Sequence, residues 1–176
     1  MNVLFVNYGN FTTNSLNHIA GFAGWLQAQG HACVVAVPGE KETLKVIDRP
    51  AFHAATYAEV LARPTGFPNN RPADLIHAWT PREGVRKFVA AYQRLLPGTR
   101  VIVHLEDNED YLLEAFGGRP IAELRELPEQ KFPYPMVDGL SHPVRYHHLL
   151  RLADGVTVIN DRLREFVPPG KPVHLL

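Results

Sequence analysis

Short, unbroken apolar runs alternate with helix-like segments in the first part of the chain. One run, Val3 to Val6, starts beside the N-terminus, and another spans His31 to Val37. Such runs are typical of strands that are buried on both faces of a parallel sheet. Between them, apolar side chains recur at helical spacing, and Gly30 follows where a helix commonly ends; these side chains are Leu16, Ile19, Ala20, Ala23 and Leu26. Residues 1–39 therefore predict a strand, a crossover helix and a parallel strand.

The middle of the chain continues this alternation after an irregular stretch. Between residues 40 and 70 we expect a short strand near Leu44 to Ile47 and a short helix around Tyr57 to Leu61. A strand from Asp74 to Trp79 follows, and then Thr80 to Glu83, which match a capping box with proline at the first helical position. The next predicted helix ends at Pro97-Gly98 and has a buried stripe formed by Val85, Phe88, Val89, Tyr92, Leu95 and Leu96.

The next strand, Val101 to Leu105, leads into the acidic turn Glu106 to Asp110 and a short helix through Phe116. Residues Gly117 to Tyr146 contain five prolines, so we expect a long, mobile loop with one short helix near Ile121 to Leu127. Its apolar side chains either face a ligand or membrane surface or pack on the domain as a satellite cluster. These side chains are Phe132, Tyr134, Met136, Val137 and Leu140.

The chain closes with a helix from His147 to Leu152, a strand from Gly155 to Ile159, a helical turn after Asn160, and a strand from Pro172 to Leu176. This alternation predicts a single α/β domain with a Rossmann-like, doubly wound parallel sheet and helices on both faces. A buried strand normally continues into a polar loop. We therefore expect residues 1–176, which end in an apolar run, to belong to a longer protein.

Composition and charge limit the partners of this domain. The chain has 176 residues, 45% of them hydrophobic and 20% charged, as is usual for a globular protein. Its 18 basic side chains balance 18 acidic ones, so we expect no nucleic-acid partner. The single cysteine, Cys33, cannot form an internal disulfide, and no signal peptide or membrane span is evident. A cytoplasmic protein is the resulting expectation.

In a doubly wound sheet, ligands bind beyond the carboxyl ends of the strands. That rule selects Tyr8, Gly9, Asn10, Thr80, Glu106 and Asp107. Carboxylates at such an edge can act as a general base, bind sugar hydroxyls or ligate a metal. Alternatively, Asp107 or Asn108 only caps the following helix. Asn14 and Ser15 lie where helix amides can bind an anion, but Thr13 or Asn14 can equally be a structural N-cap.

Other kinds of site are disfavoured. Gly9 stands alone where a dinucleotide fingerprint needs three spaced glycines, and no P-loop lysine motif occurs. The histidines between positions 142 and 148 lack neighbouring cysteine or carboxylate ligands, so we expect no metal site. His77 and His104 are expected within the sheet, and no nucleophile triad can be assigned from spacing.

Three stretches occur in a familiar order. The first joins NSLNHI at residues 14–19 to LQAQGH at residues 26–31, the second is DLIHA at residues 74–78, and the third is ADGVTVIN at residues 153–160 with Leu163. In this order they resemble the first helix with its "L…GH" turn, the "D-h-h-H" strand and the "A-D-x-V-h-h-S…L" strand of GT-B-fold glycosyltransferases, where h is hydrophobic. The resemblance is strongest to the N-terminal domain of glycosyltransferase family 4.

The resemblance implies transfer of a sugar from a nucleotide-sugar donor to a carbohydrate, lipid or small-molecule acceptor, without a cofactor or metal ion. This half would bind the acceptor and close over the donor, and residues 117–146 would lie on the acceptor side. Most of the donor site would belong to a C-terminal GT-B domain of the same protein, so the chain alone would be inactive. Peripheral contact with the inner face of the membrane is compatible with this role.

The chain also departs from the family pattern. The family often has a glycine pair in the first loop, whereas here Gly9 is followed by Asn10. A histidine commonly ends the strand that here continues into Glu106 and Asp107, which become the candidate catalytic residues. The candidate cleft-binding residues are Tyr8, Gly9, Asn10, Asn14, Ser15, His18, Thr80 and Asn160. The alternative function is a self-standing α/β ligand-binding or regulatory module without catalysis.

Overall fold

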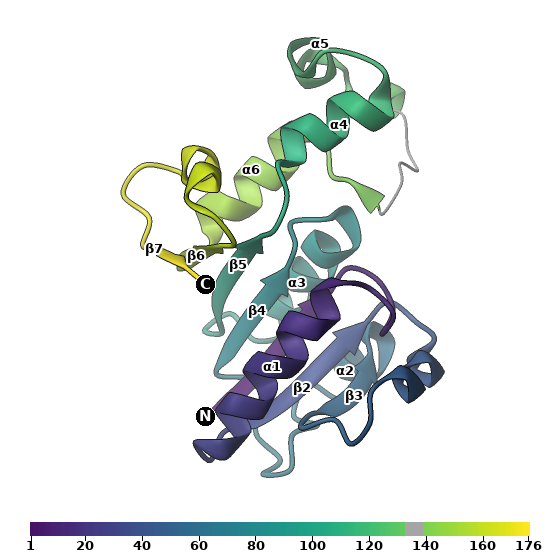
Figure 1. Cartoon of the computed structure of the whole chain (residues 1–176), viewed down its shortest axis with the longest axis vertical. Helices are drawn as coiled ribbons and strands as arrows, with labels where there is room; N and C mark the ends of the chain where they lie inside the picture. Colours follow the sequence, from purple (N-terminus) through teal and green to yellow (C-terminus); the bar gives the residue numbers. More distant parts are fainter. Residues whose placement is uncertain (133–138) are drawn as a thin grey trace.

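The computed structural model describes residues 1–132 and 139–176. A single seven-stranded sheet organises them, with all pairings parallel and the order β3-β2-β1-β4-β5-β6-β7 (Figure 1). The strands are β1 (Asn2–Asn7), β2 (Ala32–Val37), β3 (His53–Thr56), β4 (Leu75–Trp79), β5 (Arg100–Leu105), β6 (Gly155–Val158) and β7 (Val173–Leu175). The predicted Rossmann-like α/β class is confirmed.

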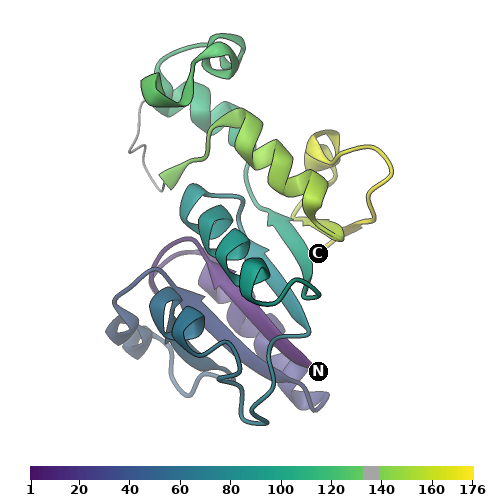
Figure 2. The same cartoon turned by 180° about the vertical axis from the view of Figure 1, so that it is seen from behind.

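Helices lie on both faces of the sheet. Figure 1 shows α1 on one face, and Figure 2, seen from behind, shows α2, α3 and α6 on the other. The α-helices are α1 (Ser15–Ala28), α2 (Tyr57–Ala62), α3 (Glu83–Leu95), α4 (Glu109–Gly117), α5 (Ile121–Glu126) and α6 (Pro143–Leu152). Short 3-10 helices are η1 (Lys41–Val46), η2 (Glu129–Lys131) and η4 (Asp161–Phe166).

Strand β1 supplies side chains to a hydrophobic core on each face. Val3 and Phe5 belong to the cluster that contains the buried residues of α1, whereas Leu4 and Val6 belong to the cluster under α2, α3 and α6. Successive side chains of a strand point to opposite faces, so a strand covered on both sides must be apolar throughout. All six residues of β1 are buried, and the four between its terminal asparagines form the unbroken apolar run Val3 to Val6.

The strand predicted at Leu44 to Ile47 is wrong, because η1 occupies this stretch and the third strand is β3. Thr43 closes the 3-10 turn, since both its amide and its hydroxyl donate to the carbonyl oxygen of Glu40. β3 lies at an edge of the sheet, and Ala55 is its one buried residue. An edge strand exposed in this way does not need an apolar run, so hydrophobicity did not reveal it.

The capping box predicted at Thr80 and Glu83 is also wrong. Helix α3 does begin at Glu83, but its N-cap residue, Arg82, makes no side-chain capping bond. The Thr80 hydroxyl instead donates to Oε1 of Glu109 at 3.4 Å and accepts from Nε of Arg82 at 3.1 Å. Partners that are distant in sequence therefore replace the local cap. The predicted stripe is buried at Val85, Phe88, Val89 and Tyr92.

The described part of residues 117–146 is largely helical, which corrects the predicted loop. Helix α5 matches the short helix expected near Ile121, and α6 begins at Pro143 rather than His147. Pro120 is the N-cap of α5 and Pro143 is the first residue of α6. Proline does not break a helix at these positions, because the amide it lacks would have no intrahelical partner there.

Two of the apolar side chains for which exposure and packing were both considered in this segment are packed inside the domain. Phe132 is 5% exposed and Leu140 is 0% exposed. Both belong to the hydrophobic core that α3 and α6 share. These two side chains therefore pack on the domain, as the second alternative expected, but within the main core and not in a satellite cluster, whereas Tyr134, Met136 and Val137 lie outside the described residues.

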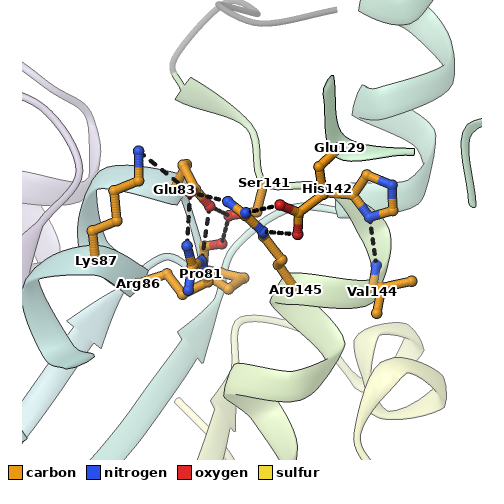
Figure 3. Close-up of polar contacts among 9 residues, drawn as sticks. All are labelled: Pro81, Glu83, Arg86, Lys87, Glu129, Ser141, His142, Val144 and Arg145. Carbon is orange, nitrogen blue, oxygen red and sulfur yellow. Dashed lines mark hydrogen bonds and ion pairs between the residues drawn. The ribbon is translucent and has the colours of Figure 1, made fainter. Parts of the chain in front are cut away.

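Charged side chains attach this segment to the start of α3 (Figure 3). The Glu83 carboxylate accepts two hydrogen bonds from Arg86 at 2.8 Å and one from Nη1 of Arg145 at 2.7 Å, and Lys87 lies 3.5 Å from it. Arg145 of α6 also binds Glu129 of η2, with Nε donating to Oε1 at 2.6 Å. The Glu83 carboxylate thus binds cations of both α3 and α6. Arg145 also links it to Glu129 and thereby holds η2 against these helices.

The last strand is not the buried strand that the sequence suggested. β7 pairs with β6 at the edge of the sheet, and Leu175 is 49% exposed. The burial expected for this strand is therefore wrong, whereas the expectation that residues 1–176 belong to a longer protein stays a prediction. The helical turn predicted after Asn160 is present as η4.

Candidate functional site

The carboxyl ends of β1, β4 and β5 meet at one edge of the sheet. Asn7, the last residue of β1, is in register with Trp79 of β4, and Trp79 is in register with His104 of β5. Because all strands are parallel, the loops that follow them open to the same side. Glu106 comes directly after β5, so this edge brings together the three segments that the sequence selected.

The first loop is held in shape by the side chain of Asn7, which is 0% exposed. Its Nδ2 donates to the carbonyl oxygens of Gly9 at 3.2 Å and Asn10 at 3.0 Å, and to the hydroxyl of Thr13 at 2.8 Å. A Cβ atom added at Gly9 would lie only 2.5 Å from Cγ2 of Thr13, so the loop needs glycine there. Gly9 therefore shapes the loop through its backbone, and Asn10 does so through its backbone and through Oδ1, which accepts from the amide and the hydroxyl of Thr12 at 2.9 Å and 2.6 Å.

Ser15 and Glu106 are brought together by the fold. Ser15 is the first residue of α1 and is 1% exposed, and its hydroxyl donates a hydrogen bond to Oε2 of Glu106. Asn14 occupies the N-cap position, as the alternative expected, but its side chain makes no capping hydrogen bond. The side chain at the start of α1 points toward β5 and not toward its own helix.

The carboxyl group of Glu106 is half-buried at this edge, and its environment raises its pKa. Burial is the largest cause, because it disfavours the charged form, and the neighbouring charge of Asp107 acts in the same direction. The hydrogen bond from Ser15 and the positive charges of His18 and Arg82 oppose the rise without cancelling it. A half-buried carboxylate with a raised pKa at the carboxyl edge of a parallel sheet is suited to accept a proton.

Arg82 organises a buried charge network beside Glu106, and it was missed in the sequence. Its side chain is 3% exposed, with Nη2 3.1 Å from Oδ2 of Asp107 and Nε 3.2 Å from Oε1 of Glu109. Its guanidinium also lies 5.1 Å from the centre of the Tyr8 ring. Burial raises the pKa of Glu109 to about 7, although Arg82 opposes the rise. Asp107 is therefore an ion-pair partner, and Asn108 caps α4 by accepting from the Tyr111 amide.

A layer of imidazole and indole rings lies below this edge on the α1 face. His77 Nε2 and His104 Nδ1 contact the hydroxyl of Thr157 at 3.1 Å and 2.8 Å. The Trp79 ring lies 3.9 Å from that of His104, and the exposed ring of His18 stacks over Trp79 at 6.2 Å. Burial lowers the pKa of both His77 and His104 to about 3, so both are neutral near pH 7. Their location within the sheet is confirmed.

Other predicted site residues have different surroundings. Thr80 is 0% exposed and its hydroxyl is hydrogen-bonded to Arg82 and Glu109, so it supports the charge network from inside the domain. The Trp79–Thr80 peptide bond is cis. Asn14 and Asn160 are exposed, and Asn160 follows β6 without a side-chain hydrogen bond in the described part of the chain.

The described residues include neither a cluster of metal ligands nor a membrane-spanning helix. Within residues 1–132 and 139–176, no group of three or more His, Cys, Asp and Glu side chains is arranged to hold a metal ion. None of the helices in these ranges is long and apolar enough to cross a membrane.

The parallel sheet with helices on both faces defines a Rossmann-like α/β domain. No model of a known protein family matches the sequence, and no curated protein matches it significantly. Among solved structures, apo UGT2 of Phytolacca americana aligns with 99% of this chain and 51% of its own, at 13% identity and a TM-score of 0.55. UGT89C1 of Arabidopsis thaliana, solved with UDP-L-rhamnose, aligns over the same shares, at 8% identity and a TM-score of 0.58.

These similarities establish the fold and not the family. The chain spans about half the length of both structures, which are glycosyltransferases of the GT-B fold. At such low identity the likeness concerns backbone architecture alone. The GT-B expectation is therefore confirmed at the level of the fold, whereas the closer resemblance to family 4 stays a prediction.

Proposed function

We propose that this chain is the acceptor-binding, N-terminal half of a glycosyltransferase that moves a sugar from a nucleotide-sugar to a hydroxyl group. The observation that carries the proposal is Glu106, a half-buried carboxyl group with a raised pKa at the carboxyl edge of the sheet. The fold supports it, since one similar structure was solved with UDP-L-rhamnose. Tyr8, His18 and Asn160 lie on the loops and helix around the same edge and are the proposed acceptor contacts.

In the proposed reaction, Glu106 accepts the proton of the acceptor hydroxyl. The hydroxyl oxygen of the acceptor forms a bond to the anomeric carbon of the donor sugar at the same time. The bond from that carbon to the diphosphate breaks, and the nucleoside diphosphate leaves with the electron pair. Ser15 holds the carboxylate in position through its hydrogen bond. Asp107, paired with Arg82, adds negative charge that favours protonation of Glu106.

The test uses the complete protein that the gene encodes, with a panel of UDP-, GDP- and ADP-sugars and pooled hydroxyl acceptors. Release of nucleoside diphosphate and the mass of the product are measured. We expect Glu106→Gln to lower kcat by about 10²- to 10⁴-fold, the usual effect of losing a general base, with little change in the donor KM. Glu126→Gln, at an exposed position of α5, is the matched control and should keep normal turnover.

Each outcome separates the proposal from its alternatives. Normal kcat in a folded Glu106→Gln variant would remove Glu106 from the reaction, and normal kcat in Asp107→Asn as well would leave the whole acidic turn with a structural role. Absence of transfer with every donor, together with tight binding of a small molecule, would favour the binding-module alternative. The chain of 176 residues by itself should release no product, because an interdomain cleft needs both walls.

A further inference from the structure

A cavity lies at the β3 edge of the sheet, beneath α2. Its volume is about 370 Å³, within the range of pockets that hold small organic molecules. Its floor is formed by Val34 of β2, Ala55 of β3, Val60 of α2 and Phe67, all of them buried. A ligand seated on this floor would bury apolar surface against carbon atoms on several sides.

This cavity is distinct from the candidate active site. β3 and β5 are four inter-strand steps apart in the sheet order, which corresponds to about 19 Å. None of the cavity residues belongs to the loops after β1, β4 or β5 that carry Tyr8, Arg82 and Glu106. In Figures 1 and 2, α2 and β3 lie at the opposite end of the sheet from β6 and β7.

The rim of the cavity carries more positive than negative groups. Lys41 of η1, His53 of β3 and Arg63 surround a single carboxylate, Glu59. Lys41 already neutralises that carboxylate, with Nζ 2.5 Å from Oε1 of Glu59. Arg63 is therefore left as a cation without a carboxylate partner among the described residues. Its one side-chain bond there is from Nη2 to the amide oxygen of Asn70 at 3.2 Å.

The wall that carries Arg63 is preformed. Helix α2 starts with a complete capping box between Thr56 and Glu59 and ends with Arg63 as its C-cap residue. The turn after it is closed by a hydrogen bond from the Gly66 amide to the carbonyl oxygen of Arg63 at 3.0 Å. A Cβ atom at residue 66 would lie 3.0 Å from that oxygen, so glycine allows the close approach. A ligand would find the site largely organised, which favours binding.

We propose that this cavity binds a small amphiphilic carboxylate. The apolar body of the ligand rests on Val34, Ala55, Val60 and Phe67, and its carboxylate faces Arg63 at the rim, with His53 beside it. The charge of the rim selects an anion, and the apolar floor selects a molecule with a hydrocarbon or aromatic body. This assignment is independent of sugar transfer at the carboxyl edge.

The test is a titration of the ¹⁵N-labelled chain with octanoate, with 1-octanol and with acetate, followed by amide NMR. We expect saturable shifts at Ala55, Gly66 and Phe67 with octanoate, affinity for 1-octanol lower by about fivefold, as expected for one partly exposed ion pair, and no saturable shift with acetate. Failure of octanoate to give saturable shifts at these amides would overturn the proposal.

Three variants sharpen the test. Ala62→Trp changes an exposed residue at the mouth of the cavity and should abolish the shifts without disturbing the sheet. Arg63→Gln should make octanoate bind no better than 1-octanol, and Arg94→Gln, an exposed arginine of α3, should behave as wild type. Undiminished octanoate binding by a folded Ala62→Trp variant would overturn the location. Equal affinities of the wild type for octanoate and 1-octanol would overturn the ligand class.

Discussion

The hydroxyl of Ser15 donates a hydrogen bond to the carboxylate of Glu106, although 91 positions separate the two residues in the chain. Ser15 opens the helix after β1, and Glu106 follows β5. β4 lies between these strands in the sheet, so the bond requires the order β1-β4-β5 to be complete. The candidate base and the residue that positions it thus meet only in the folded sheet.

This bond predicts how Glu106 responds to loss of the serine. A hydrogen bond to the charged form lowers the pKa of a carboxyl group, so Ser15→Ala should raise the pKa of Glu106 further above its ordinary value. The measurement is a ¹³C NMR titration of the side-chain carboxyl carbons. Ser141→Ala, which removes a buried hydroxyl near Glu83, is the control and should leave the Glu106 titration unchanged. An unchanged or lower pKa in Ser15→Ala would contradict the contact.

Glu109 should make the domain less stable as the pH rises. Its pKa is raised from 4.5 to about 7, so between these values the folded state binds more proton than the unfolded state, and the free energy of unfolding falls with increasing pH. Glu109→Gln removes this contribution. The unfolding free energy of the wild type, measured relative to that of the variant, should fall by roughly 3 kcal/mol from pH 4 to pH 8. Urea denaturation across that range measures it, and a constant difference would be evidence against the shift.

His77 should act in the opposite direction in an overlapping range. Its pKa is lowered from 6.5 to about 3, so the stability that the neutral ring allows is present above pH 6.5 and is lost as the pH falls toward 3. His77→Phe keeps a ring in the buried layer and cannot be protonated. Between pH 7 and pH 5 the wild type should lose about 2 kcal/mol relative to this variant. Glu109 is present in both proteins and its opposite pH dependence cancels in the difference between them, so that difference is the diagnostic quantity.

The charge cluster at the start of α3 predicts unequal effects of two similar cations. Arg145 contacts both Glu83 and Glu129, and the Glu83 side chain is only 10% exposed, whereas Lys87 is 67% exposed and 3.5 Å from Glu83. Arg145→Gln should lower the free energy of unfolding by about 1 to 2 kcal/mol, and Lys87→Gln by less than about 0.5 kcal/mol. Urea unfolding followed by circular dichroism compares them. Equal losses would mean that the network does not anchor α6.

The interior of the sheet could be predicted because burial on both faces imposes a recognisable pattern. Val3 to Val6 must be apolar at every position, and a short continuous apolar run of this kind is typical of a strand buried on both faces. The edge strand β3 was not predicted, because Ala55 is its only buried residue and its sequence therefore has no apolar run. Prolines misled the prediction in the segment before β6, since Pro120 and Pro143 stand at helix starts, where proline is tolerated. The number of prolines in a segment does not decide whether it is helical, because a proline interrupts a helix only when it lies inside it.

The candidate site was predicted in part for a similar reason. The rule for parallel sheets selects Glu106 from its place after a strand, without any contact being known. It cannot reveal that Ser15 points at Glu106 or that Arg82 lies buried between Asp107 and Glu109. A buried arginine needs partners supplied by tertiary structure, and in the sequence it looks like any surface cation.

The place of β1 in the sheet also has a consequence for synthesis of the protein. β1 is made first, yet it lies between β2 and β4, and its neighbours follow at Ala32 and Leu75. Until the second of these strands has left the ribosome, an apolar strand with unpaired backbone groups on at least one edge is exposed to other chains. Substitutions that make this strand more prone to aggregation should therefore reduce the yield of folded protein without altering the final fold.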